Sequence, residues 1–414
     1  MPLTGIIAEF NPFHLGHAVP IAAAREAMEG AGTVVCVMSG NCVQRGDLAI
    51  FSKVARAEAA VRCGADLVVE LPLSYVLGSA ERFAEGAVAL LASMGEPETY
   101  LAFGCEKADG AGLAAAASAL DTREVQERIR AGMRTGLSYG SACQAALNIE
   151  GEVAALLKTP NNLLGIEYLR AIHRLGANIT PLPVAREGVA HDSGIPAGGY
   201  ASASHLRSLL HSAGANIARP LSEVADPWTY MPAVAAEVFR RELTSGRGPA
   251  SLEQIEAAVL SLLRLQEPPE GGYLDDSEGL SLRLAAIARK VGSFRELLEA
   301  SKTKRYHLSR IRRLILVMCL GLTSAHRPKL PPYIRVLAAG ERGRVLLRRL
   351  AKGASLPVLS RPGEGRRLGL VASELLAKES AATDLMALCF TGPARRGGGE
   401  WRTVPILVEG LDFP

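Results

Sequence analysis

The first half of the chain alternates short aliphatic runs with stretches of helical periodicity, and this alternation limits the possible folds more than any other feature. The aliphatic runs are continuous instead of alternating with polar residues, which is typical of parallel strands buried on both faces. The predicted strands cover residues 5–9, 33–38, 65–71, 100–103 and 179–184, and the predicted helices between them include 18–28 and 53–63. The pattern predicts an α/β fold with a doubly wound, Rossmann-like parallel sheet.

The length of 414 residues allows two or three domains, so that one can carry chemistry while another binds a partner. Helical periodicity dominates the middle of the chain, and strand and helix patterns return near the C-terminus. The predicted boundaries are 1–221 for an α/β catalytic domain with a helical insertion at about 109–158, 222–330 for a helical region, and 331–414 for a small C-terminal α/β module.

Composition points to a soluble globular protein, with 48% hydrophobic and 21% charged residues. The net charge of +4 is too small to identify a nucleic-acid partner by itself. The seven cysteines are scattered and contain no Cys-x-x-Cys pair, which fits reduced thiols in a cytosol. No secretory signal is visible, and no apolar run approaches the roughly 20 residues of a membrane span. We therefore expect a cytoplasmic protein without a membrane partner.

The sharpest motif is His14-Leu15-Gly16-His17, between the first predicted strand and the following helix. A helix N-terminus offers free backbone N–H groups to phosphate, and Gly16 allows close approach of the backbone. His14 and His17 can donate hydrogen bonds to the phosphate as charge builds up during displacement, which makes them the catalytic candidates. The alternatives are two surface or core imidazoles, or two metal ligands. Zinc is disfavoured because no cysteine or third histidine accompanies the pair.

Two further segments are candidate ligand contacts. The loop at 39–46 follows a predicted strand, where open α/β sheets place ligands, and its candidate substrate-loop residues are Ser39, Asn41, Gln44 and Arg45. The alternative is a solvated turn. The turn at 159–168 enters a helix, and Asn161 is either a helix cap or a contact to a base or ribose.

The segment at 201–207 follows a glycine pair and combines serines with an arginine one turn later. Ser204 and Arg207 therefore form a candidate anion site for β- and γ-phosphates, although a plain helix cap would also use a serine. Arg186, just after the strand predicted at 179–184, adds a cation near the carboxyl edge of the sheet.

Together these motifs resemble the bacterial tRNA(Met) cytidine acetate ligase family of the His-x-Gly-His nucleotidyltransferase superfamily. The similarity rests on EFNPFHLGH, SGNCVQRG, GADLVVELP, TPNNLLGIEY, SASHLR and TKRYHLSRIRR, and it extends to about residue 322. It implies that ATP and acetate form acetyl-adenylate, which then acetylates N4 of the wobble cytidine of elongator tRNA(Met). The residues that it implies for ATP are Ile7, Ala8, Glu9, Phe10, Asn11, Pro12, Phe13, His14, Leu15, Gly16, His17, Ala18, Val19, Pro20, Gly104, Asn161 and Arg186.

A basic segment at 302–313 holds six Lys or Arg residues around one tyrosine. Such a segment predicts a phosphate track with an aromatic ring available for stacking, and the alternative is a helix with a solvated basic face. The candidate tRNA contacts are Lys302, Lys304, Arg305, Tyr306, Arg310, Arg312 and Arg313.

Two other functions share some of these features. A small-molecule adenylyltransferase of cofactor biosynthesis uses the same histidine motif but is often much shorter, and a nucleotide-binding scaffold would not need His17. We expect Mg²⁺ only because ATP phosphates normally carry it. No motif points to an obligate protein partner.

Overall fold

The computed structural model describes residues 2–137, 139–147, 156–157, 159–185, 199–215, 226–277, 279–303 and 306–410. Its centre is an eight-stranded sheet in the order β10-β8-β5-β2-β1-β6-β7, with β9 also paired to β8. The strands are β1 (Leu3–Ala8), β2 (Thr33–Ser39), β5 (Leu67–Leu71), β6 (Thr99–Cys105), β7 (Thr180–Ala185), β8 (Ile334–Ala339), β9 (Val358–Leu359) and β10 (Ile406–Leu407). Neighbouring strands are parallel except for β5 and β8. The predicted parallel α/β sheet is confirmed.

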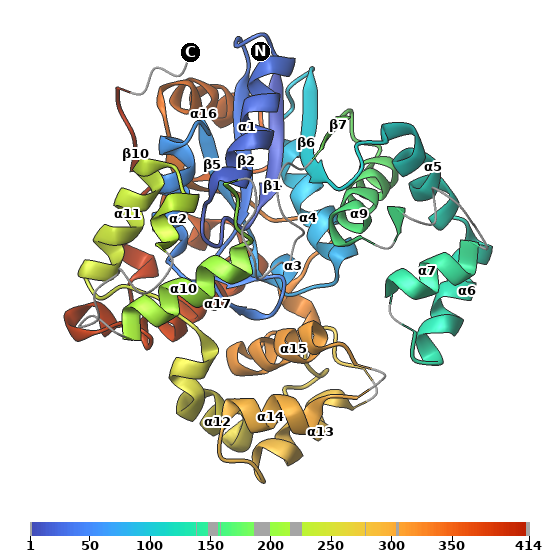
Figure 1. Cartoon of the computed structure of the whole chain (residues 1–414), viewed down its shortest axis with the longest axis vertical. Coiled ribbons are helices and arrows are strands. Elements are labelled where there is room, and N and C mark those ends of the chain that lie inside the picture. Colours follow the sequence, from blue (N-terminus) through green and yellow to red (C-terminus); the bar gives the residue numbers. More distant parts are fainter. Residues whose placement is uncertain are drawn as a thin grey trace.

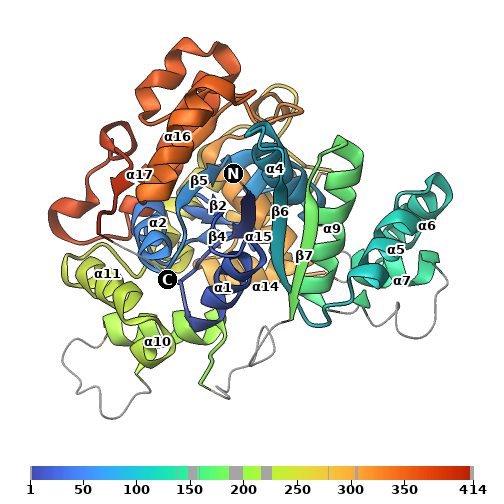
Figure 2. The ribbon, with the colours of Figure 1, turned by 90° about the horizontal axis from the view of Figure 1, so that it is seen from above.

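The two faces of the sheet bury alternate residues of the same strands. In β2, Val35 and Val37 belong to one apolar core, whereas Val34 and Cys36 belong to the core on the opposite face. The first face is covered by α4 (Ala80–Ser93), α9 (Pro160–Leu175) and α16 (Glu341–Gly353); the second by α1 (Leu15–Ala27), α2 (Lys53–Arg62), α10 (Ala203–Ala215) and α11 (Ala233–Thr244). Figure 2 shows these two layers of helices around the sheet.

A separate apolar core holds the helical region below the sheet in Figure 1. It contains α12 (Glu256–Leu265), α13 (Leu280–Ala288), α14 (Phe294–Ser301) and α15 (Leu308–Leu320), together with side chains from α3 (Leu73–Val76) and α17 (Leu370–Ala387). The helical insertion predicted at 109–158 contains α5 (Gly110–Leu120), α6 (Arg123–Arg134) and α7 (Tyr139–Leu147), which project to one side. The described 3₁₀ turns are Pro227–Tyr230, Leu252–Ile255, Ser324–His326, Pro362–Arg367, Gly392–Arg395 and Glu400–Arg402.

The strands of region 331–414, which the sequence predicts as a small C-terminal α/β module, lie in the central sheet. β8 pairs antiparallel with β5 and so extends the sheet of the N-terminal half. Buried ion pairs join the same regions: Lys53 Nζ lies 2.7 Å from Glu70 Oε1 and 2.9 Å from Glu400 Oε2. Strand pairing between residues so far apart in sequence leaves no local signal, because the strand pattern at 334–338 fits either arrangement.

No helix in the described part of the chain is long and apolar enough to cross a membrane.

Candidate active site

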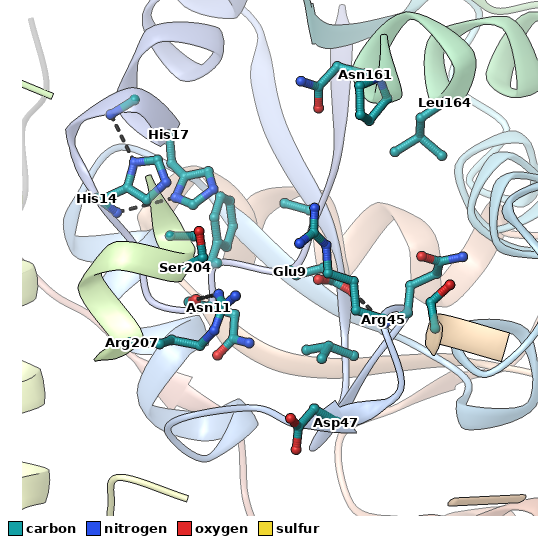
Figure 3. A pocket seen from close by; sticks show the side chains of 18 of the residues that line it. Glu9, Asn11, His14, His17, Arg45, Asp47, Asn161, Leu164, Ser204 and Arg207 are labelled. Carbon is teal, nitrogen blue, oxygen red and sulfur yellow. Dashed lines mark hydrogen bonds between the residues drawn. The ribbon is translucent and has the colours of Figure 1, made fainter. Parts of the chain in front are cut away.

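A cleft with a volume of about 1450 Å³ lies at the carboxyl ends of β1 and β6. Its walls come from the start of α1, the loop after β2, the start of α9, one side of α10 and the first turns of α15. In Figure 3 the two histidines of α1 lie next to Ser204 and Arg207 of α10, and Asn161 and Leu164 of α9 lie on another wall. Helices far apart in the chain therefore meet at the edge where parallel α/β sheets bind ligands.

His14 and His17 organise the N-terminus of α1. His14 is the N-cap residue, and its Nδ1 accepts a hydrogen bond from the backbone N–H of Gly16 at 3.1 Å. His17 Nδ1 accepts from the backbone N–H of His14 at 3.2 Å, and the two rings stack with centroids 3.8 Å apart. Since each Nδ1 is an acceptor, each neutral ring carries its proton on Nε2. Both residues line the cleft, as the motif predicts.

Gly16 also lines the cleft, and a Cβ atom at this position would lie 3.0 Å from Cε1 of His14. A side chain would press against the ring that caps the helix. Glycine is therefore needed here for close packing as well as for access to the backbone N–H groups.

The start of α10 forms the wall beside the histidines. Ser202 Oγ accepts from the backbone N–H of His205 at 3.2 Å, so Ser202 caps the helix. Ser204 and Arg207 line the cleft, and Arg207 Nη1 donates to the backbone oxygen of Asn11 at 2.8 Å. The two residues predicted as an anion site are thus brought next to the histidine motif.

The loop after β2 divides into two parts. Gln44 and Arg45 line the cleft, and the backbone N–H of Gln44 donates to Glu9 Oε1 at 2.6 Å. Burial raises the pKa of Glu9, although this hydrogen bond and the charges of nearby arginines act in the opposite direction. The loop therefore holds a carboxylate of the β1 end in the wall of the cleft.

Ser39 and Asn41 are buried and do not line the cleft, so the structure does not bring these two residues together with the other candidate contacts. Asn41 Oδ1 accepts from the backbone N–H of Lys53 at 2.8 Å, and its Nδ2 donates to Thr383 Oγ1 at 2.9 Å. The side chain joins α2 to α17 and has a structural role.

On the opposite wall, Glu106 holds the start of α9. Its Oε1 accepts from Asn161 Nδ2 at 2.7 Å and its Oε2 from the backbone N–H of Asn162 at 3.0 Å, while Asn162 Oδ1 accepts from the backbone N–H of Glu106 at 3.0 Å. The N-cap residue of α9 is Thr159, so Asn161 does not have the cap position considered from the sequence. Gly104 and Asn161 both line the cleft.

The other predicted ATP residues surround this core. Those that line the cleft are Ile7, Ala8, Phe10, Asn11, Val19 and Pro20. Those that do not line it are Pro12, Phe13, Leu15 and Ala18. Phe13 is fully buried and supports the motif from behind. Arg186 lies outside the described residues.

The basic segment is less open than its sequence suggests. Tyr306 is 7% exposed and Arg310 lies over its ring at 5.0 Å, so the ring is not an open platform for stacking. Arg312 lines the cleft, whereas Arg313 Nη1 donates to the backbone oxygen of Gln44 at 3.0 Å. Lys302 is exposed, and Lys304 and Arg305 lie outside the described residues.

Sequence reasoning missed a group of polar residues that line the same cleft. They are Asp47, Ser208, His211, Ser251, Glu253, Gln254, His307 and Ser309. Ser208 follows Ser204, and His211 follows Arg207, at the four-residue spacing of one helix face, which is a local signal that could have identified them. Those at 251–254 and 307–309 belong to the helical region and reach the cleft only through tertiary packing.

No cluster of His, Cys, Asp or Glu in the described residues could hold a metal ion.

The sheet, the cleft at its carboxyl edge and the His-x-Gly-His helix start define a HIGH-type nucleotidyltransferase. The family model described as HIGH Nucleotidyl Transferase matches residues 1–399. The tRNA(Met) cytidine acetate ligase of Acetivibrio thermocellus is 33% identical over 99% of this chain and 100% of its own length. That of Thermotoga maritima is 35% identical over 85% of each chain.

Two crystal structures of Thermotoga maritima TmcAL, one apo and one bound with alpha-thio ATP, are also similar. They superpose with TM-scores of 0.89 and 0.86 at 31% identity, over 99% of this chain and 100% of theirs. The chain belongs to the tRNA(Met) cytidine acetate ligase family, and it is an enzyme of the ligase class. The resemblance seen in the motifs is confirmed.

Proposed function

We propose that this enzyme activates acetate with ATP and transfers the acetyl group to N4 of the wobble cytidine of elongator tRNA(Met). In the first step an acetate oxygen attacks the α-phosphorus of ATP, and pyrophosphate leaves. In the second step the N4 amine attacks the acetyl carbonyl carbon, AMP leaves, and N4 loses a proton. The products are AMP and N4-acetylcytidine.

The observation that carries the first step is the meeting of the α1 and α10 N-termini in one cleft. His14 and His17 line the cleft and carry a hydrogen on each Nε2. They can therefore donate hydrogen bonds to the phosphate where negative charge develops, which is the role of a catalytic residue in this step. Ser204 and Arg207 supply the anion site for the leaving pyrophosphate. The nucleotide enters as its Mg²⁺ complex, with the ion on its phosphates.

The other wall fits the adenosine part of ATP. Gly104 leaves the end of β6 open for a close approach, and Asn161 is held in place by Glu106. Family membership and the ATP analogue in the related structure support this placement.

The tRNA side of the proposal rests on the basic segment, with the exposed Lys302 and the half-buried Arg310 as phosphate contacts. We also propose a cytoplasmic location, which the seven free cysteines support.

The test is a comparison of two half-reactions. Purified protein is assayed for exchange of radiolabelled pyrophosphate into ATP with and without acetate, and tRNA is then analysed by nucleoside mass spectrometry. Acetate-dependent exchange together with acetate-dependent N4-acetylcytidine is the expected result. Exchange that needs a phosphorylated metabolite in place of acetate, with unmodified tRNA, would overturn the proposal in favour of a small-molecule adenylyltransferase.

A further inference from the structure

The cleft is larger than one nucleotide requires. Ligand pockets usually measure about 300 to 1,000 Å³, whereas this cleft measures about 1450 Å³. The residues proposed to bind ATP lie in the half of the cleft between α1, α9 and α10. The other half is formed by the β3–β4 hairpin (Cys42–Val43 and Asp47–Leu48), the turn at Leu252–Ile255 and the start of α15.

The two halves carry different chemistry. The ATP half has imidazoles, a guanidinium and two helix starts, which suit phosphate, and its carboxyl group, that of Glu9, accepts a hydrogen bond from the backbone N–H of Gln44. The second half holds two carboxylates, Asp47 and Glu253. Both line the cleft together with His211, whose pKa is lowered by burial while the charges of these two carboxylates oppose the shift. Carboxylates repel phosphate and accept hydrogen bonds from amino groups.

The Asp47 carboxylate is held in place and keeps capacity for a ligand. Oδ1 accepts from the backbone N–H of Leu48 at 2.8 Å and of Leu252 at 3.2 Å, and Oδ2 accepts from Arg312 Nη1 at 2.7 Å. An ionised carboxylate offers about four acceptor positions. The described contacts of Asp47 therefore leave one acceptor position, next to the guanidinium of Arg312.

Gln254 provides a neutral donor in the same half. Its Oε1 accepts from the backbone N–H of Ser251 at 3.0 Å, which fixes the amide so that its NH₂ group is the part left for a ligand. Leu48 and Leu308 line this half as well and offer apolar surface for the face of a ring. The combination is two acceptors, two donors and an apolar wall.

We propose that this second half binds one unpaired cytosine base of the acceptor RNA, with Asp47 and Glu253 accepting from its exocyclic amine and Arg312 and Gln254 donating to N3 and O2. This inference rests on the proposed function, because it identifies where the acceptor lies relative to the adenylate. Carboxylates commonly read cytosine through N4. Uracil presents an oxygen at the position of the amine, so the two carboxylates reject it. Bases in RNA loops can be turned out of the stack to reach such a pocket.

The experiment compares Asp47→Asn and Glu253→Gln with Glu299→Gln, which removes an exposed carboxylate of α14 that does not line the cleft. Each full-length variant is assayed for pyrophosphate exchange without RNA and for acetyl transfer to tRNA. Binding is measured to two anticodon-loop RNA hairpins that carry either cytidine or uridine at the acceptor position. A thermal unfolding scan verifies that each variant is folded.

The expected result is that the ratio of transfer rate to exchange rate falls about tenfold or more in both cleft variants. The preference for the cytidine hairpin should shrink in the same variants, and Glu299→Gln should behave as wild type. A wild-type ratio and a wild-type cytidine preference in both variants would overturn the subsite. If the unsubstituted enzyme shows no acetate-dependent exchange or no transfer to cytidine, the proposed function itself has failed, which is a different outcome.

Discussion

Asp47 Oδ2 and Arg312 Nη1 lie 2.7 Å apart, and this ion pair joins the β3–β4 hairpin to the first turns of α15. A neighbouring hydrogen bond from Arg313 to Gln44 strengthens the same junction. Gly46, at φ +82°, packs against the backbone of these two arginines so closely that a Cβ atom would overlap it. Two of the basic residues that look like tRNA contacts in the sequence therefore hold a wall of the cleft.

We predict different effects for reversing the charges of this segment one at a time. Arg312→Glu places a carboxylate beside Asp47, so the free energy of unfolding should fall by about 1 to 3 kcal/mol and pyrophosphate exchange should fall with it. Arg310→Glu should weaken tRNA binding with little effect on either quantity. Chemical denaturation measures the free energy of unfolding, exchange assays measure the first half-reaction, and filter binding measures the affinity for tRNA. Equal effects of the two variants on exchange would contradict this division.

We predict that His17→Ala lowers the rate constant of pyrophosphate exchange by about 100-fold to 1,000-fold, because it removes a hydrogen-bond donor from the developing charge. The KM for ATP should change much less. His173→Ala is the matched control, since this histidine lies on α9 with a side chain that is 79% exposed. If His17→Ala retains exchange within a few fold of the wild type, the catalytic role of His17 must be abandoned.

We predict that Arg56→Met destabilises the edge of the sheet that carries the site. The fully buried Arg56 donates to the backbone oxygens of Phe51, Glu9, Ser39 and Gly40, and burial lowers its pKa to about 10. The variant leaves these oxygens without their donor, so the free energy of unfolding should fall by about 3 kcal/mol or more.

The control is Arg62→Met on the same helix, whose side chain is 33% exposed and pairs with Glu58 at 3.0 Å. It should cost about 0 to 1 kcal/mol. Urea unfolding of both variants measures the two free energies of unfolding. Equal losses would show that Arg56 contributes no more to stability than the half-buried Arg62.

We predict a pH dependence from Glu379. Burial, followed by the charge of Glu70, raises the pKa of Glu379 well above its usual value of 4.5. Above pH 4.5 the unfolded carboxyl loses its proton while the folded one keeps it. The folded state then binds more protons, so stability falls as the pH rises, by up to about 1.4 kcal/mol per pH unit until the folded pKa is reached.

Glu379→Gln removes this titration, so the variant should gain stability relative to the wild type as the pH increases from 4.5. The charges of this buried cluster still balance when the side chain at position 379 is neutral. The positive Lys53 and Arg335 then face the two remaining carboxylates, those of Glu70 and Glu400. Thermal unfolding between pH 4.5 and 8 measures the difference, with Glu374→Gln on the same helix as control. Parallel pH curves for the wild type and Glu379→Gln would contradict the prediction.

The sequence predicts the parts of the site that depend on neighbouring residues. The strand, the His-x-Gly-His helix start and the Ser204–Arg207 turn each carry a local pattern, and all three reach the cleft. The loop after β2 shows the limit of this reasoning. Gln44 and Asn41 share one polar segment, yet Gln44 lines the cleft and Asn41 is buried, because Asn41 forms hydrogen bonds with Lys53 of α2 and Thr383 of α17.

Long-range contacts explain the remaining differences. Glu253 belongs to the helical region and lies in none of the motifs, so only the packing of that region against the hairpin brings it to the cleft. The basic residues at 310–313 have similar side chains, but the surface that each one meets differs. Charge alone therefore predicts a basic segment and does not assign a role to each arginine.

The antiparallel pairing of β8 with β5 has a consequence for how the enzyme is made. A ribosome delivers β5 and Lys53 long before it delivers residues 334–339 and Glu400. Until then the edge of β5 has no partner strand from the C-terminal part, and Lys53 has only part of its carboxylate environment. An open apolar strand edge invites pairing with other chains. Nascent chains that stall before residue 334 should thus be the species that depends most on chaperones.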